Sequence, residues 1–136
     1  MVMQPGLLDT STLILLARVA DPSELPDIPS ISAITLAELS VGPLVAATES
    51  ERAARQAHLQ LAEADFDPIP FDTSAARAFA RVAQSLREAG RKPTARAFDA
   101  LIAATAISRD LPLHTCNPDD FAGIPELDLR PVTVAP

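Results

Sequence analysis

Short apolar runs alternate along this chain with longer stretches in which apolar residues recur at helical spacing. The short runs predict strands at residues 6–9, 30–33, 112–115 and 129–134. Residues 68–71 contain two prolines and are expected to form an edge strand, where proline is tolerated. Apolar periodicity, caps and helix-ending glycines predict helices from 10 to 19, 35 to 42, 48 to 64, 72 to 90 and 95 to 109.

The helix expected at residues 72–90 has a clear amphipathic pattern. Asp72-Thr73-Ser74 caps its start, and Gly90 ends it. We expect one face to carry Ala76, Phe79, Ala83 and Leu86, and another to carry Arg77 and Arg81. Because strands and helices alternate along the chain, the pattern predicts an α/β fold with a parallel sheet covered on both faces. Ligands of such sheets bind beyond the carboxyl ends of the strands.

Four acidic residues occur in short motifs of otherwise apolar and small residues. They are Asp9 in LLDTS, Glu38 in TLAEL, Asp99 in FDALIAATA and Asp120 in NPDDF. Gathering carboxylates is costly because like charges repel and a half-buried carboxylate loses hydration. A fold that gathers them usually holds a divalent cation, and an all-oxygen site selects Mg²⁺ or Mn²⁺ over zinc. Such a centre suits phosphodiester hydrolysis and predicts a metal-dependent nuclease.

Each acid also has a purely structural interpretation. Asp9 could cap the helix that begins at Thr10. Thr35-x-x-Glu38 is a capping-box sequence, so the glutamate could bond the Thr35 amide. Asp99 could be favoured by a helix dipole, and the doublet Asp119-Asp120 could cap the turn around Phe121. Three or four such caps need not converge, so their joint occurrence at strand ends favours a shared site.

Length and composition bound the class of protein. The 136 residues, 48% of them hydrophobic, predict a single folded domain over residues 1–136. One cysteine, Cys116, excludes an internal disulfide, and the apolar run 13–17 is too short for a membrane span and unlike a signal peptide. We therefore expect a cytoplasmic protein with no membrane role.

His58, His114 and Cys116 show no ligand spacing or activating arrangement, and we expect structural or passive roles for them.

The net charge of −7 is unfavourable for a nucleic-acid binder, whose affinity normally comes from neutralising phosphates. Charge is unevenly distributed, however. Residues 74–98 carry six basic side chains against the single acid Glu88, a local charge of +5 that leaves −12 for the rest. This stretch is either a solvated helix face beside an acidic body or a surface for phosphates.

The ordered motifs LLDTS, ISAITLAEL-x-x-G, FDALIAATA and HTCNPDDF resemble those of PIN-domain ribonucleases, in particular VapC-type toxins of bacterial toxin–antitoxin pairs. The resemblance extends from Leu7 to Val134. It implies a three-layer α/β/α PIN fold with a mainly parallel sheet, and an endoribonuclease that depends on Mg²⁺ or Mn²⁺. The family's acids fall on Asp9, Glu38, Asp99 and Asp120, and its supporting polar residues on Thr10 or Ser11, Thr115 and Asn117.

The resemblance also implies partners. Such toxins are held inactive by a cognate VapB antitoxin, commonly form homodimers, and assemble further with the antitoxin.

The doublet Asp119-Asp120 leaves open which of the two is the fourth acid, although the register with Phe121 favours Asp120. Charge clustering makes Arg91, Lys92 and Arg96, which precede Asp99, candidates for binding RNA phosphates.

Other classes fit less well. A receiver-type phosphoacceptor needs a lysine near its aspartate, but Lys92, the only lysine, is expected in a loop. An aspartyl phosphatase needs D-x-D where this chain has Asp9-Thr10-Ser11, and no P-loop motif is present. The serious alternative is a catalytically silent PIN domain that only binds an antitoxin or RNA.

Overall fold

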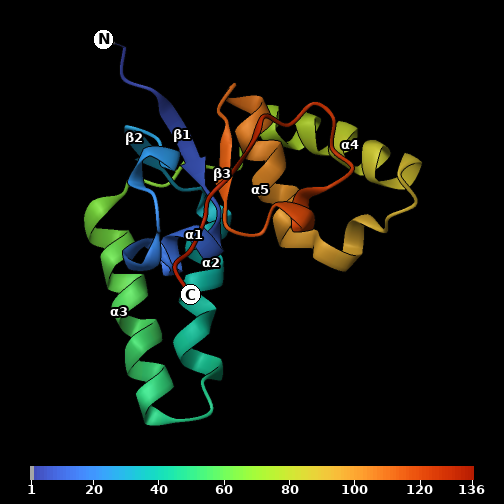
Figure 1. Ribbon diagram of the computed structural model, residues 1–136. Helices are drawn as coiled ribbons and strands as arrows, with labels where there is room; N and C mark the ends of the chain where they lie inside the picture. The colour runs from blue at the N-terminus through green and yellow to red at the C-terminus, as the bar shows by residue number, and fades with distance from the viewer. Residues whose placement is uncertain (1) are drawn as a thin grey trace.

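The computed structural model describes residues 2–136 (Figure 1). In this part of the chain a parallel sheet has the strand order β2-β1-β3-β4. Its strands are β1 (Pro5–Leu8), β2 (Ile28–Ser30), β3 (Leu113–Thr115) and β4 (Leu129–Pro131). The α-helices are α1 (Thr10–Ile14), α2 (Ala33–Val41), α3 (Glu49–Asp65), α4 (Thr73–Glu88) and α5 (Ala97–Ser108). Short 3₁₀ helices connect them: η1 (Leu16–Arg18), η2 (Pro22–Glu24), η3 (Gly42–Val45), η4 (Pro93–Arg96) and η5 (Pro118–Phe121).

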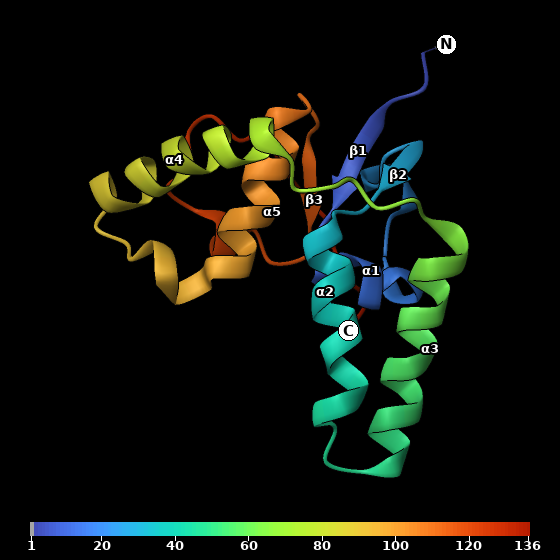
Figure 2. The same cartoon turned by 180° about the vertical axis from the view of Figure 1, so that it is seen from behind.

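The helices cover both faces of the sheet, which confirms the predicted three-layer α/β/α fold. Successive residues of a strand point to opposite faces. Leu7 accordingly packs into the core cluster that α4 and α5 form, and Leu8 packs with Leu13, Ile31 and Leu39 on the other side. Figure 2 shows the same division, with α4 and α5 on one side and α1, α2 and α3 on the other.

Helices α4 and α5 pack closely because small residues line their contact. The buried face of α4 consists of Ala75, Ala78, Val82 and Leu86, and Phe79 packs against the same core cluster. The predicted apolar face was therefore right at Leu86 and Phe79 and wrong at Ala76. Ala76 is exposed, because alanine can occupy either side of a helix and the α5 contact selects Ala75 and Ala78 instead. Gly90 ends the helix with a φ of 75°, as predicted.

The start of α2 differs from the prediction by two residues. Ser32 is the N-cap, and its Oγ accepts a hydrogen bond of 3.1 Å from the Thr35 amide. The helix therefore begins at Ala33 rather than Thr35, and the strand expected at residues 30–33 ends at Ser30. This strand, β2, lies at an edge of the sheet, where Pro29 is tolerated.

Two other predicted strands are shorter than expected. Residues 68–71 form only an isolated bridge between Ser32 and Ile69, because the flanking prolines have no N–H to continue a ladder. The last strand, β4, ends at Pro131 for the same reason, and Val134 instead forms an antiparallel bridge to Val19.

The first helix is shorter than predicted, whereas the third begins where its capping box predicted. Helix α1 ends at Ile14 and continues as η1 instead of running to residue 19. Helix α3 has the predicted start, since Thr48 Oγ1 accepts from the Glu51 amide at 3.1 Å and Glu51 Oε2 accepts from the Ala47 amide at 3.1 Å. None of the helices in residues 2–136 has the length and apolar character needed to cross a membrane.

Candidate metal centre

Asp9 lies directly beyond the carboxyl end of β1 and is almost completely buried. Its carboxylate caps α1 by accepting from the Thr12 amide at 3.0 Å, as the structural interpretation predicted. Hydroxyl groups also donate to it: Thr12 Oγ1 at 2.6 Å, Thr115 Oγ1 at 2.8 Å and Ser11 Oγ at 3.0 Å. Because β1 and β3 are neighbours, Thr115 at the end of β3 reaches Asp9. Capping and membership of an acidic centre are therefore compatible roles for this residue.

Glu38 faces the start of α1 from the middle of α2. Its Oε1 accepts a hydrogen bond of 2.7 Å from Thr10 Oγ1, and the Thr10 and Thr35 hydroxyl oxygens are 3.0 Å apart. The capping-box interpretation of Glu38 was wrong, because Ser32 caps α2 and the glutamate side chain bonds Thr10 instead. The hydroxyl after Asp9 thus positions a second acid.

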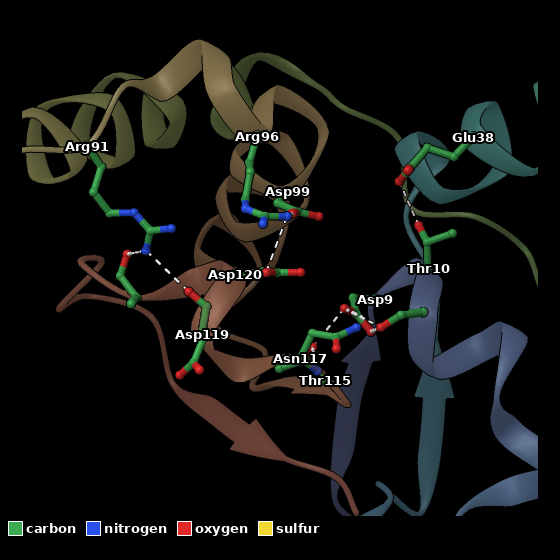
Figure 3. Close-up of polar contacts among 12 residues, drawn as sticks. Asp9, Thr10, Glu38, Arg91, Arg96, Asp99, Thr115, Asn117, Asp119 and Asp120 are labelled. Carbon is green, nitrogen blue, oxygen red and sulfur yellow. Dashed lines mark hydrogen bonds and ion pairs between the residues drawn. The ribbon is translucent and has the colours of Figure 1, made fainter. Parts of the chain in front are cut away.

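Asp99 and Asp120 are linked by an arginine of the same chain (Figure 3). Arg96 Nη1 lies 3.2 Å from Asp120 Oδ1 and 3.9 Å from Asp99 Oδ2. Asp99 is in the first turn of α5, and Asp120 is in η5, which follows β3. The side chain of Asp119 points away from this group in Figure 3. The geometry therefore favours Asp120 over Asp119 as the fourth acid.

The acids affect one another electrostatically. Burial, followed by the charges of Asp120, Glu38 and Asp9, raises the pKa of Asp99 to about 6, while Arg96 opposes this rise. Burial also raises the pKa of Glu38, against the hydrogen bond from Thr10, and Asp9 adds to the rise. Such mutual repulsion is the electrostatic signature of an uncompensated carboxylate site.

The donor chemistry fits a hard divalent cation. All four side chains offer carboxylate oxygens, which Mg²⁺ and Mn²⁺ prefer. Within residues 2–136, however, no three acidic, histidine or cysteine side chains are already close enough together to hold one ion. The guanidinium of Arg96 instead provides positive charge between Asp99 and Asp120. A cation bound there would compete with this arginine for the same oxygens.

The predicted RNA-binding residues lie in different surroundings. Arg91 Nη1 donates to the backbone carbonyls of Ala122 at 2.7 Å and Asp119 at 3.3 Å, so this side chain also ties η5 to the end of α4. Lys92 is exposed, and Arg96 is half-exposed beside the acids. All three line a cavity of about 200 Å³ that also borders Asp99 and Asp120. Their role in RNA binding stays a prediction.

The remaining candidates have structural surroundings. His114 is buried with Nδ1 2.8 Å from the Glu24 carbonyl, and burial lowers its pKa. Burial raises the pKa of the Cys116 thiol, which favours the passive role predicted for it. Asn117 precedes η5, and its backbone N–H donates to Thr115 Oγ1 at 2.9 Å.

Thr12 is the site residue that sequence reasoning missed. Its buried hydroxyl donates to Asp9 and accepts from the Cys116 amide at 3.0 Å, so it joins α1 to the segment after β3. The available signal was its position three residues after the N-cap, where a hydroxyl can return to the capping carboxylate. This signal was hidden because LLDTST offers three consecutive hydroxyl groups.

The fold and site together define an α/β/α protein with an acidic centre beyond the carboxyl edge of a parallel sheet. The PIN domain family model matches residues 7–127. Ribonuclease VapC5 of Mycobacterium tuberculosis is 45% identical over 121 residues, which cover 88% of this chain and 87% of that protein. Ribonuclease VapC8 of the same species is 37% identical over 101 residues, which cover 74% of this chain and 89% of VapC8. The chain belongs to the PIN-domain family.

Solved structures agree with this assignment. The crystal structure of VapBC-5 from Mycobacterium tuberculosis, a member of the VapBC family of toxin–antitoxin systems, matches with a TM-score of 0.81 at 42% identity. The match covers 96% of this chain and 98% of that one. VapBC2 from Rickettsia felis, solved bound to a DNA fragment from its promoter, matches with a TM-score of 0.72 at 23% identity and supports the fold alone. The family resemblance predicted from the motifs is confirmed.

Proposed function

We propose that residues 1–136 act as one PIN domain, the toxin of a VapBC-type pair, and cut RNA internally by hydrolysing phosphodiester bonds. The observation that carries this proposal is the placement of the acids: Asp9 follows β1, Glu38 bonds Thr10 beside it, and Arg96 links Asp99 to Asp120. Burial, together with the charges of Asp120, Glu38 and Asp9, raises the pKa of Asp99 to about 6, as expected of acids gathered at one site. Relatives that are named as VapC ribonucleases support the same activity. PIN-domain ribonucleases are metal-dependent, and the oxygen ligands here favour Mg²⁺ or Mn²⁺.

Asp9, Glu38, Asp99 and Asp120 would hold the cation. When bound, a divalent cation supplies Lewis-acid polarisation of the phosphodiester and activation of water. The protein contributes the positions of the oxygens. Hydroxyl groups of Ser11, Thr12 and Thr115 fix both carboxylate oxygens of Asp9. Thr10 orients Glu38, and the backbone N–H of Asn117 donates to the Thr115 hydroxyl oxygen.

The raised pKa values have a consequence for binding. A carboxylate that is costly to ionise gains most from a positive ligand, because the ligand removes the repulsion between neighbouring charges. Protons and metal ions therefore compete for Asp99, and cleavage should fall as the pH drops through about 6.

A VapB-type antitoxin is the inhibitor that we propose for this chain, in an assembly built on a toxin homodimer and located in the cytoplasm. Support comes from the likeness to VapBC-5 of Mycobacterium tuberculosis, a toxin–antitoxin system, at 42% identity. The ion pairs of Arg96 show that a guanidinium group is accepted between Asp99 and Asp120. An antitoxin tail with a basic side chain could therefore engage the same acids.

The alternative is a silent PIN domain that binds an antitoxin or RNA without cutting. The observation that favours it is again Arg96, because its guanidinium already neutralises part of the acidic centre. Metal-dependent cutting of RNA separates the two functions.

The test is cleavage of total cellular RNA by the purified chain with Mg²⁺, with Mn²⁺ and with EDTA. The Asp99→Asn protein loses one charge at the proposed centre with little change of volume. We expect it to cut at least about 100-fold more slowly, the scale associated with removing a group that stabilises charge in the transition state.

The Asp119→Asn protein is the matched control, because it removes the same charge from the neighbouring acid that points away from the centre. We expect it to retain activity within about twofold. Equal activity of the Asp99→Asn and wild-type proteins would reject the role of Asp99. Absence of metal-dependent cutting by the wild type, with antitoxin binding retained, would favour the silent domain.

A further inference from the structure

Phe98 is an unusual aromatic residue in this molecule. The chain contains five phenylalanines and no tryptophan or tyrosine. Phe121 is buried, and Phe66, Phe71 and Phe79 pack against the two core clusters. Phe98, in the first turn of α5, is 54% exposed and immediately precedes Asp99. An exposed aromatic ring beside an acidic centre has no part in the core and calls for a different explanation.

Phe98 lines an open cavity of about 360 Å³ that reaches from α2 to the start of α5. Its other walls include Glu38, Arg96 and Asp99. A second cavity of about 200 Å³ shares Arg96 and Asp99 and continues toward Lys92 and Asp120. The two cavities therefore meet at the proposed cleavage site, one with an aromatic wall and the other with a basic rim.

We propose that the cavity bordered by Phe98 binds one unpaired nucleotide of the RNA substrate, with the base stacked on the Phe98 ring and the adjoining phosphate near Arg96. This inference rests on the proposed function and specifies its substrate as single-stranded at that position. Bases in RNA are recognised by stacking on aromatic side chains once they are unpaired. Stacking on an aromatic side chain is accessible to every base and is worth about 1–3 kcal/mol per base.

The combination of neighbours favours a nucleotide over an apolar protein segment. A nucleotide offers an apolar ring face and a negative charge within a single unit, and the cavity is lined by both Phe98 and Arg96. The guanidinium of Arg96 is half-exposed, and within residues 2–136 its ion pairs are with acids of the proposed metal centre. If those acids held a cation, their attraction for Arg96 would be weaker and the guanidinium would be available for a phosphate.

The absence of tryptophan and tyrosine makes a direct experiment possible. The Phe98→Trp protein contains a single tryptophan, located at the proposed stacking surface. Binding is measured in an Asp120→Asn background to suppress cutting, with Mg²⁺ and a ten-nucleotide oligoadenylate as the probe. We expect the oligonucleotide to quench the tryptophan fluorescence, and an abasic chain of the same length to leave it unchanged.

Affinity gives the second measurement in the same background. We expect Phe98→Leu, which keeps an apolar side chain, to weaken oligoadenylate binding by about 5- to 150-fold, and Phe98→Trp to preserve it. Leu44→Ala serves as the control, because Leu44 is an exposed apolar residue in η3, between α2 and α3, and does not line either cavity. This variant should bind like the parent.

Several outcomes would overturn the proposal. Binding by Phe98→Leu within twofold of the parent, with no quenching in Phe98→Trp, removes the stacking role while leaving the ribonuclease proposal intact. A changed oligomeric state of Phe98→Leu with unchanged RNA affinity identifies Phe98 as a contact between protein chains instead. If the wild type neither binds nor cuts RNA, the proposed function and the subsite fail together.

Discussion

The two helical pairs of this molecule use apolar residues in opposite ways. Helices α4 and α5 bury theirs in the larger core cluster, where Ile102, Ala103 and Ala104 are completely inaccessible. Helices α2 and α3 extend from the sheet as a separate hairpin (Figure 2). The end of α2 and the following η3 expose Val41, Leu44 and Val45. The first pair supplies stability, and the second displays a surface.

This difference divides the acidic centre as well. Asp99 and Asp120 are on α5 and η5, which contribute Ile102 and Phe121 to the larger core. Asp9 follows Leu8 and caps α1, and both pack in the smaller cluster. Glu38 is on α2, whose cluster is small and consists of Leu8, Leu13, Ile31, Leu39 and Ala62. The position of Glu38 therefore depends more on local contacts, above all on its hydrogen bond from Thr10. Glu38 is thus held by one hydroxyl, whereas Asp9 accepts from three and Asp99 and Asp120 share Arg96.

The largest expected effect tests the packing side of this comparison. Ile102→Ala removes a completely buried side chain from the α5 core, and we expect the free energy of unfolding to fall by about 2–5 kcal/mol. Leu44→Ala at the hairpin, 83% exposed, should change it by less than about 0.5 kcal/mol. Urea denaturation followed by circular dichroism measures both. Similar losses for the two variants would contradict the division into a stabilising pair and a displayed pair.

A smaller effect concerns the cost of gathering the acids. The folded-state pKa of Asp99 is raised from 3.8 to about 6, so the folded protein binds this proton more tightly than the unfolded chain does. The resulting stabilisation is present below about pH 4 and is lost as the pH rises through about 6. In EDTA at about pH 7.5, Asp99→Asn should therefore raise the free energy of unfolding by about 1–2 kcal/mol.

The advantage of Asp99→Asn should shrink as the pH falls below about 5, because the wild-type carboxyl is then protonated and uncharged as well. Asp119→Asn, which alters the acid that points away from the centre, is the control measured beside it. Thermal unfolding across this pH range measures both variants. A pH-independent difference for Asp99→Asn would show that the acids do not repel one another as described.

The smallest expected effect on stability tests the hydroxyl that holds Glu38. Thr10→Val keeps the shape of the side chain but removes the donor of the 2.7 Å bond, and we expect it to cost about 1 kcal/mol or less. Its effect on Mn²⁺ affinity, measured by calorimetry, should be larger, about tenfold, as for other residues that orient metal ligands. Thr10→Ser restores the donor and should restore the affinity. Equal Mn²⁺ binding by Thr10→Val would remove Thr10 from the site.

Sequence patterns predicted the parallel sheet and the placement of Asp9 and Asp120 beyond strand ends, because strand–helix alternation fixes which edge the loops occupy. They did not predict that Ser32 caps α2, since two hydroxyl residues three positions apart offer competing caps. The burial of Ala75 in place of Ala76 was also missed, because two adjacent alanines are equal candidates for the apolar face. The Arg96 ion pairs depend on how η5 packs against α5, which local sequence does not specify.

Both edge strands of the sheet are three residues long and contain a proline, Pro29 in β2 and Pro131 in β4. Short, proline-containing edges resist the addition of a further strand, because proline cannot donate a ladder hydrogen bond. A strand of another polypeptide therefore has little backbone to pair with on either side of this sheet. The protein is protected against edge-to-edge aggregation, and its stable complexes should form through helices and side chains.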